Sequence, residues 1–259
     1  MPIDIRMEVA KYYDASRVPF DDISFYIQQM PKPQARVLEL GCGTGRVLLP
    51  LVEHCANIHG LDYSEAMLNI CQEKLQQSAI SPERARIDVA DITIFDIGQQ
   101  FDFIIAPFRV MQNLATDTEV NGLFRCIQRH LAPGGTAILN VFRPYWDQEQ
   151  MLKEWCRPEK FNYETPVDGG HLRRYDRLAH ITANPLVCYP ELIYRLYQDD
   201  QLVDEAILPI AMRCYYPDEF LALIEGHGFQ VTGAWGGYAG EPYGEGGELV
   251  VAFMKRTSV

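Results

Sequence analysis

The sequence has little positive charge. Its 259 residues include 23 Lys and Arg against 35 Asp and Glu, which gives a formal net charge of −12 at pH 7. A chain with this balance is repelled by the phosphates of nucleic acids and by anionic lipid headgroups. We therefore expect neither a nucleic acid nor a membrane as a partner.

Long apolar runs and closely spaced cysteines are also missing. No stretch approaches the 18 consecutive apolar residues that predict a membrane-spanning helix. Asp4, Arg6 and Glu8 interrupt the start of the chain, which argues against a signal peptide. The seven cysteines form no CxxC pair, which argues against a zinc site and favours reduced thiols in a cytoplasm. We expect a cytoplasmic protein.

The composition that is present is globular, with 47% apolar and 22% charged residues. It excludes a disordered, collagen-like or coiled-coil chain. Short apolar runs alternate with amphipathic stretches as far as residue 142. The predicted strands are 36–40, 58–62, 86–89, 101–105 and 136–142, and the predicted helices are 46–55, 65–77 and 117–130. This alternation predicts a parallel sheet wrapped by helices.

The pattern changes after residue 142. Residues 143–216 contain period-two stretches that predict a small antiparallel sheet. The chain then closes with a helix and two strands, predicted at 217–227, 229–234 and 248–254. The expected fold class is α/β, with a doubly wound, mostly parallel seven-stranded Rossmann-like sheet and an antiparallel β insertion after the fifth strand. We interpret residues 1–259 as one domain, with an N-terminal helical segment at 1–35 and an inserted subdomain at 143–216.

A glycine cluster, Glu39-Leu40-Gly41-Cys42-Gly43-Thr44-Gly45, follows the first strand. Its glycines allow a tight turn, and the next helix offers free N–H donors. A dinucleotide fingerprint would need a further glycine at position 46, where the chain has Arg46. Glu39 would repel a pyrophosphate and suits a cationic group such as an ammonium. A tight turn without a ligand is the alternative interpretation of the loop alone.

Two more acidic residues follow predicted strands. Asp62 ends the second strand, where a carboxylate can accept both hydroxyls of a ribose. Asp91 follows the third strand, where it either bonds an adenine amino group or caps a turn. Because open α/β sheets bind ligands at the carboxyl ends of their strands, we expect Glu39, Asp62 and Asp91 to share one site.

With these residues the chain resembles the class I S-adenosylmethionine-dependent methyltransferases. The resembling stretches are 37–45, 60–68, 88–92 and 131–135, in the order and spacing of that family. The resemblance implies that S-adenosylmethionine is the cofactor. It also implies cofactor contacts at Tyr13, Glu39, Gly41, Cys42, Gly43, Gly45, Asp62, Tyr63, Met67, Asp91, Ile92 and Phe108.

The resemblance assigns a part of the cofactor to each group of residues. Glu39 and the glycine loop would hold the methionine portion, and Asp62 the ribose. The adenine would contact Tyr63, Met67, Asp91 and Ile92, the sulfonium would lie by Phe108, and Tyr12 or Tyr13 would cover the cofactor.

The segment after the fourth strand, Ala106-Pro107-Phe108-Arg109, narrows the acceptor. It resembles neither the Asn/Asp-Pro-Pro-aromatic motif of amino-directed DNA and protein-glutamine methyltransferases nor the Pro-Cys motif of cytosine-C5 enzymes. We therefore expect methyl transfer to an N or O atom of a small-molecule acceptor. Related small-molecule enzymes often have His where this chain has Asn113, which is a poor general base.

The catalytic residues consequently stay unassigned. The candidate substrate contacts are Arg109, Asn113, Tyr175 and Tyr238, together with His171, Glu241 and Tyr243, and for each a purely structural role is the alternative. No third oxygen ligand accompanies Asn113 and Asp117, so we expect no metal ion in the reaction.

Several alternatives stay open. The chain could be a catalytically silent S-adenosylmethionine-binding module, an NAD-dependent oxidoreductase, which Arg46 disfavours, or an RNA or protein methyltransferase, which the charge disfavours. The insertion carries 11 of the 29 aromatic residues, which favours a cap that forms an acceptor pocket. Its own small core or a homodimer contact would explain the same enrichment.

Overall fold

The computed structural model describes residues 4–15 and 21–256. Its larger sheet has the strand order β11-β12-β5-β4-β1-β2-β3, in which β12 is antiparallel to both neighbours. The strands of this sheet are β1 (Arg36–Leu40), β2 (Asn57–Asp62), β3 (Ala85–Val89), β4 (Phe101–Ala106), β5 (Leu131–Phe142), β11 (Phe229–Trp235) and β12 (Glu248–Lys255). The predicted doubly wound, mostly parallel sheet of seven strands is confirmed.

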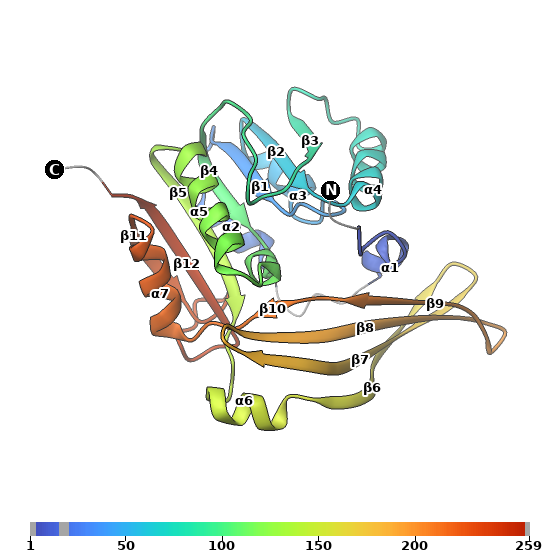
Figure 1. Ribbon diagram of the computed structural model, residues 1–259. Helices are drawn as coiled ribbons and strands as arrows, with labels where there is room; N and C mark the ends of the chain where they lie inside the picture. The colour runs from blue at the N-terminus through green and yellow to red at the C-terminus, as the bar shows by residue number, and fades with distance from the viewer. Residues whose placement is uncertain (1–3, 16–20, 257–259) are drawn as a thin grey trace.

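Helices cover both faces of this sheet (Figure 1). One face packs against α5 (Asp117–His130) and α7 (Pro217–Gly226). The other packs against α2 (Ile23–Gln29), α3 (Leu48–Leu51) and α4 (Glu65–Gln77). Two 3₁₀ turns, η1 (Val52–His54) and η2 (Val110–Asn113), complete the connections. None of the helices in the described ranges is long and apolar enough to cross a membrane.

Side-chain caps explain why the longer helices begin where the sequence predicts. Ser64 precedes α4, and its hydroxyl accepts a hydrogen bond from the Met67 N–H at 3.3 Å. Thr116 precedes α5 and forms a reciprocal capping box with Glu119. These caps satisfy backbone donors that the first helical turn cannot pair internally.

Two expected elements have different bounds. The helix predicted over 46–55 is shortened to α3 and η1, because Pro50 has no N–H for the helical ladder. Residues 131–135, which lie between the predicted helix at 117–130 and the predicted strand at 136–142, belong instead to β5, since Leu131 is buried and pairs with Phe101. The register then shifts before Phe103, so a β-bulge accommodates the residues that resemble a turn.

The inserted sheet follows β5 and the short helix α6 (Gln148–Glu154). Its order is β10-β8-β7-β6, with β9 also pairing with β8. The strands are β6 (Arg157–Val167), β7 (Gly170–Ala183), β8 (Leu186–Gln198), β9 (Gln201–Pro209) and β10 (Met212–Arg213), all paired antiparallel. The predicted antiparallel insertion after the fifth strand is confirmed.

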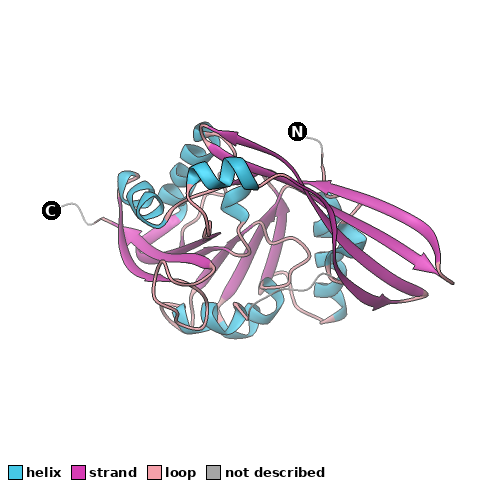
Figure 2. Cartoon of the chain, turned by 90° about the horizontal axis from the view of Figure 1, so that it is seen from below, coloured by secondary structure: helices cyan, strands magenta, loops and turns pink. Residues whose placement is uncertain are grey.

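The inserted sheet lies across the carboxyl ends of the parallel strands (Figures 1 and 2). Its inner face packs Leu172, Tyr194 and Leu208 against α1 (Ala10–Tyr13). Because side chains alternate along a strand, Arg173 and Tyr175 lie on the opposite, outer face. The inner face is therefore the one turned toward the edge where cofactor contacts are predicted.

Candidate functional site

The glycine loop folds tightly against its neighbours. The N–H groups of Gly41 and Cys42 both donate to the Leu61 carbonyl, at 2.7 and 3.0 Å. Gly41 has φ +70°, and a Cβ there would lie 2.6 Å from Val110 Cγ2. Gly45 has φ +82°, and a Cβ there would lie 2.3 Å from Leu49 Cδ1. Both positions need glycine for conformation and for space.

Glu39 is the penultimate residue of β1, just before this loop, and is 2% exposed. Burial raises the pKa of its carboxyl well above the ordinary value, although the Arg46 charge acts in the opposite direction. Its Oε2 atom has no hydrogen-bond partner within the described ranges. A buried carboxylate oxygen without a donor is costly, so this atom fits a cationic group supplied by a ligand.

Asp62 is fixed at the end of β2 by backbone donors. Its Oδ2 accepts from the Gly43 N–H and its Oδ1 from the Ser64 N–H, both at 2.9 Å. Burial is the largest influence on its pKa, which is raised. Met67 lies beside the same loop, since its Cε would be 3.3 Å from a Cβ at Gly43. Carboxylate oxygens can accept further bonds, so Asp62 retains capacity for a hydroxyl.

Asp91 follows β3 and caps its own turn. One carboxylate oxygen accepts from the Thr93 N–H at 2.8 Å and from the Thr93 hydroxyl at 2.7 Å. The Ala90 N–H donates to the Asp62 carbonyl, which ties this turn to the end of β2. The capping role is visible here, and the adenine contacts of Asp91 and Ile92 stay predictions.

Residues 4–15, which we call the N-terminal clamp, touch the turn after β2. The Ser64 hydroxyl donates to Asp4 at 2.8 Å. The Arg6 guanidinium donates to the Tyr63 hydroxyl, and its Cζ lies 5.1 Å from the centre of the Tyr63 ring. Tyr63 thus lies between the N-terminal clamp and the end of β2.

The N-terminal clamp also connects the glycine loop to the inserted sheet. The Thr44 hydroxyl donates to Asp14 at 2.6 Å. On the other side, Lys11 pairs with Asp204 of β9 at 2.5 Å, and the Tyr12 hydroxyl donates to the same carboxylate. These twelve residues therefore contact both sheets.

The paired tyrosines of α1 have different surroundings. Tyr12 is buried and stacks on Tyr194, with ring centres 6.0 Å apart. Burial raises the pKa of Tyr13, and the charges that act on it include Arg6, Arg46 and Asp62. Tyr13 is therefore the member of the pair that lies at the predicted cofactor edge, whereas Tyr12 anchors the inserted sheet.

Arg46 forms contacts beside the glycine loop that the sequence analysis did not predict. Its two Nη atoms donate to the two oxygens of Asp22, at 2.6 and 2.7 Å. Its Cζ lies 5.3 Å from the centre of the Phe108 ring. Its position directly after the glycine loop is the sequence signal that marks Arg46, although from the sequence alone it only disfavours a dinucleotide fingerprint.

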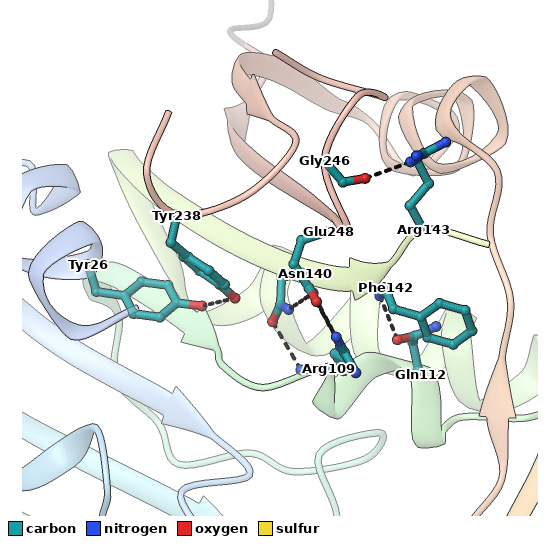
Figure 3. A network of polar contacts seen from close by, with 9 residues as sticks. All are labelled: Tyr26, Arg109, Gln112, Asn140, Phe142, Arg143, Tyr238, Gly246 and Glu248. Carbon is teal, nitrogen blue, oxygen red and sulfur yellow. Dashed lines mark hydrogen bonds and ion pairs between the residues drawn. The ribbon is translucent and has the colours of Figure 1, made fainter. Parts of the chain in front are cut away.

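Beyond β4, Phe108 and Arg109 adopt left-handed backbone conformations with φ of 55° and 65°. Such values are uncommon for residues with a side chain. Asn140 accepts from the Arg109 N–H at 3.0 Å and donates to Glu248 at 3.0 Å, while Glu248 pairs with the Arg109 guanidinium (Figure 3). This triad of Arg109, Asn140 and Glu248 holds the turn that presents Phe108.

The predicted substrate contacts separate into two places. Asn113 folds back onto the Val110 carbonyl at 3.2 Å. Tyr238 lies beside Tyr26, with hydroxyls 3.5 Å apart, near the triad (Figure 3). Tyr175 lies on the outer face of the inserted sheet, with its ring centre 4.7 Å from Arg195 Cζ. The first two thus lie beyond the carboxyl ends of β4 and β11, where cofactor contacts are predicted, and Tyr175 lies away from that edge.

The remaining candidates make structural contacts. His171 stacks on Tyr197 on the outer face. The Tyr243 hydroxyl donates to the Pro217 carbonyl at 2.9 Å, and Glu241 accepts from the Ala239 N–H at 3.1 Å. Across the ranges that the structure describes, no group of three or more His, Cys, Asp or Glu side chains could hold a metal ion.

Comparisons with a protein family, with curated proteins and with solved structures all find methyltransferases similar to this chain. Residues 37–135 match the family described as a methyltransferase domain. The chain is 27% identical to a dTDP-4-amino-2,3,4,6-tetradeoxy-D-glucose N,N-dimethyltransferase of Saccharopolyspora spinosa, over 78% of this chain and 74% of that protein. It spans about half the length of other curated relatives that it matches.

Solved structures share the fold over nearly the whole chain. The CcbJ methyltransferase of Streptomyces caelestis has a TM-score of 0.77 at 19% identity, covering 98% of each chain. The amino pentose methyltransferase CalS10 of Micromonospora echinaspora has a TM-score of 0.71 at 20% identity, covering 96% of each. Residues 37–135 therefore match a methyltransferase domain, and the chain as a whole has the fold of known S-adenosylmethionine-dependent methyltransferases.

Proposed function

We propose that the protein transfers a methyl group from S-adenosylmethionine to the amino nitrogen of a small aminosugar-like acceptor. The observation that carries the cofactor part is the buried Glu39 carboxylate, whose Oε2 atom has no donor among the described residues. It lies at the start of a loop that needs glycine at positions 41 and 45. The ammonium of the cofactor is a suitable partner for this carboxylate.

The remaining cofactor residues fit the same ligand. Asp62 is oriented by two backbone N–H groups and is available for the ribose hydroxyls. Tyr63 and Met67 lie beside Asp62, where their side chains would pack on the adenine. Tyr13 of α1 would cover the cofactor. When bound, S-adenosylmethionine supplies an electrophilic methyl group on a sulfonium that is a good leaving group. The task of the chain is then to bind, align and exclude water.

The extent of the similarity to an aminosugar N,N-dimethyltransferase supports an aminosugar-like acceptor. The alignment with the aminosugar N,N-dimethyltransferase covers 78% of the chain. An unbroken alignment of that length must include the middle of the chain, so it extends into the inserted sheet. An amine acceptor also suits a chain with a net charge of −12, because a negative field raises the local concentration of a cationic amine.

We further propose that the insertion at 143–216 caps the acceptor pocket. Its inner face is turned toward the carboxyl ends of the parallel strands, and α1 fills part of the space between the two sheets. Protection mapping by hydrogen exchange with a turned-over acceptor tests this proposal. Protection confined to the cofactor loops would leave the insertion with a structural role.

A screen of aminosugars and other small amines, read out as S-adenosylhomocysteine formation, tests the function. Asp62→Ala is the matched variant, and we expect its affinity for S-adenosylhomocysteine to fall by about 1.5–3 kcal/mol, the value of a hydrogen bond to a charged group. Glu73→Ala, which removes an exposed carboxylate on α4, is the control. Binding without turnover of any acceptor would favour a silent module, and nicotinamide binding would favour an oxidoreductase.

A further inference from the structure

Arg46 is held as a preorganised cation beside the glycine loop. The side chain of its partner Asp22 is 1% exposed and that of Arg46 is 23% exposed. Both Nη atoms contact the two carboxylate oxygens, so the guanidinium plane is fixed by a bidentate pair. The Phe108 ring, 5.3 Å from Cζ, contributes a second support.

This arrangement leaves part of the guanidinium for a ligand. Arginine has five N–H donors in a fixed fork, and the pair with Asp22 uses one on each Nη. Within the ranges that the structure describes, the Nε–H and the second N–H of each Nη make no hydrogen bond to the protein. A partly exposed guanidinium with these donors suits a carboxylate, which it can bind bidentately.

The charges nearest to Arg46 indicate which ligand group would reach it. Arg46 and Glu39 act on each other electrostatically across the start of the glycine loop. One is a cation with donors to spare, and the other is a buried carboxyl with an unpartnered oxygen. Together they present opposite charges to the two ends of a zwitterionic amino acid group.

We infer that Arg46 binds the α-carboxylate of S-adenosylmethionine while Asp22 holds its guanidinium in place. This inference rests on the proposed function, because it requires the cofactor to be S-adenosylmethionine. Arg46 is thereby a cofactor-binding residue, and Asp22 is a positioning residue that acts through it. The residue that breaks the dinucleotide fingerprint would then select an amino acid group.

The test compares two ligands that differ only in this carboxylate. S-adenosylmethionine and decarboxylated S-adenosylmethionine share the adenine, the ribose, the sulfonium and the ammonium. We expect the wild-type protein to bind the decarboxylated form about 10- to 100-fold more weakly, the range for hydrogen bonds to a charged group. Arg46→Gln should abolish that difference. Titration calorimetry on the full chain measures both affinities without an acceptor.

Two further variants make the comparison specific. Arg36→Gln removes an arginine that pairs with Asp102 at the opposite edge of the sheet, and it should leave the ratio of the two affinities unchanged. Asp22→Asn with Arg46→Gln removes both partners of the buried pair, so it decides the question if the single variant does not fold. The ratio within one variant cancels any destabilisation that affects both ligands.

Three results would overturn the inference. Equal affinity of the wild-type protein for the two ligands would exclude a carboxylate contact and leave the proposed function intact. Equal weakening of both ligands by Arg46→Gln would make Arg46 a structural residue of the loop. A wild-type protein that binds neither ligand would remove the proposed function and this inference together.

Discussion

The two sheets of this protein hold their polar side chains in different ways. In the parallel sheet, Glu39, Asp62 and Asn140 are almost completely buried and lie close to the carboxyl ends of strands that are otherwise apolar. In the inserted sheet, the polar side chains form ion pairs on a partly exposed surface, such as Arg195 with Glu159 and Glu205. Packing therefore fixes the polar side chains of the parallel sheet, whereas ion pairs at the surface fix those of the inserted sheet.

This difference predicts how each sheet responds to change. A buried polar group has few alternative partners, so its loss leaves another group unsatisfied. A surface pair exchanges its partner for water at little cost. We therefore expect large effects of substitution at the carboxyl ends of the parallel strands and small effects on the outer face of the inserted sheet. Four substitutions test this contrast.

The largest effect is expected for Gly41→Ala in the glycine loop. The new Cβ would lie 2.6 Å from Val110 Cγ2 at a φ of +70°. Overpacking and left-handed strain together should lower the free energy of unfolding by about 2–5 kcal/mol. Gly134→Ala, with φ +73° and no atom within 4 Å of the added Cβ, isolates the strain at about 1–2 kcal/mol. Urea denaturation giving equal losses would contradict the role of close packing.

The next effect is expected for Arg109→Gln in the triad. Glu248, which is 5% exposed, would lose its cation, and an uncompensated buried carboxylate costs about 3 kcal/mol. The left-handed turn at Phe108 would also lose its support. We expect a lower denaturation midpoint together with weaker S-adenosylhomocysteine binding. Glu248→Gln with Arg109→Gln, which removes both charges, should recover part of the stability but little of the binding.

Glu39→Gln should separate stability from binding. Burial raises the pKa of Glu39 above its value in the unfolded chain, so the folded state binds more protons. The contribution of Glu39 to the free energy of unfolding therefore falls as pH rises from about 4.3. The amide removes that loss, so the ligand-free variant should melt higher at pH 7, by a few degrees for about 1 kcal/mol. The advantage should vanish near pH 4, and S-adenosylhomocysteine binding should weaken.

The smallest effect is expected for Arg195→Gln on the outer face. Its side chain is 23% exposed, and its partners are 30% and 40% exposed. Exposed pairs contribute less than about 1 kcal/mol, and the substitution is remote from the cofactor edge. We expect a small change in the denaturation midpoint and no change in cofactor affinity. A loss as large as that of Arg109→Gln would contradict the contrast between the two sheets.

Local signals explain which parts of the fold the sequence predicts. The bounds of α4 and α5 follow from hydrophobic periodicity and from capping residues such as Ser64, which act within a single turn. The parallel strands follow from short buried runs that end at glycine or aspartate. The inserted sheet follows from its period-two pattern, but its strand pairing depends on hairpins whose register no local signal sets.

The polar contacts of the site show the limit of this reasoning. Arg46 and Asp22 are separated by 24 residues, and Asn140 and Glu248 by 108. Such pairs depend on strand register and on how helices pack, which a single sequence does not specify. A usable signal did exist for Asn140, because a polar residue inside an apolar strand must find a buried partner. The roles of the cofactor residues stay predictions.

The N-terminal clamp limits how this protein can be redesigned. Lys11 and Tyr12 contact β9, while Asp4, Arg6 and Asp14 contact the loops of the parallel sheet. A chimera that imports the inserted sheet of a relative to change acceptor preference would keep the N-terminal clamp but lose Asp204, the shared partner of Lys11 and Tyr12. The exchangeable module is therefore discontinuous in sequence, and grafting it requires residues 4–15 to travel with the insertion.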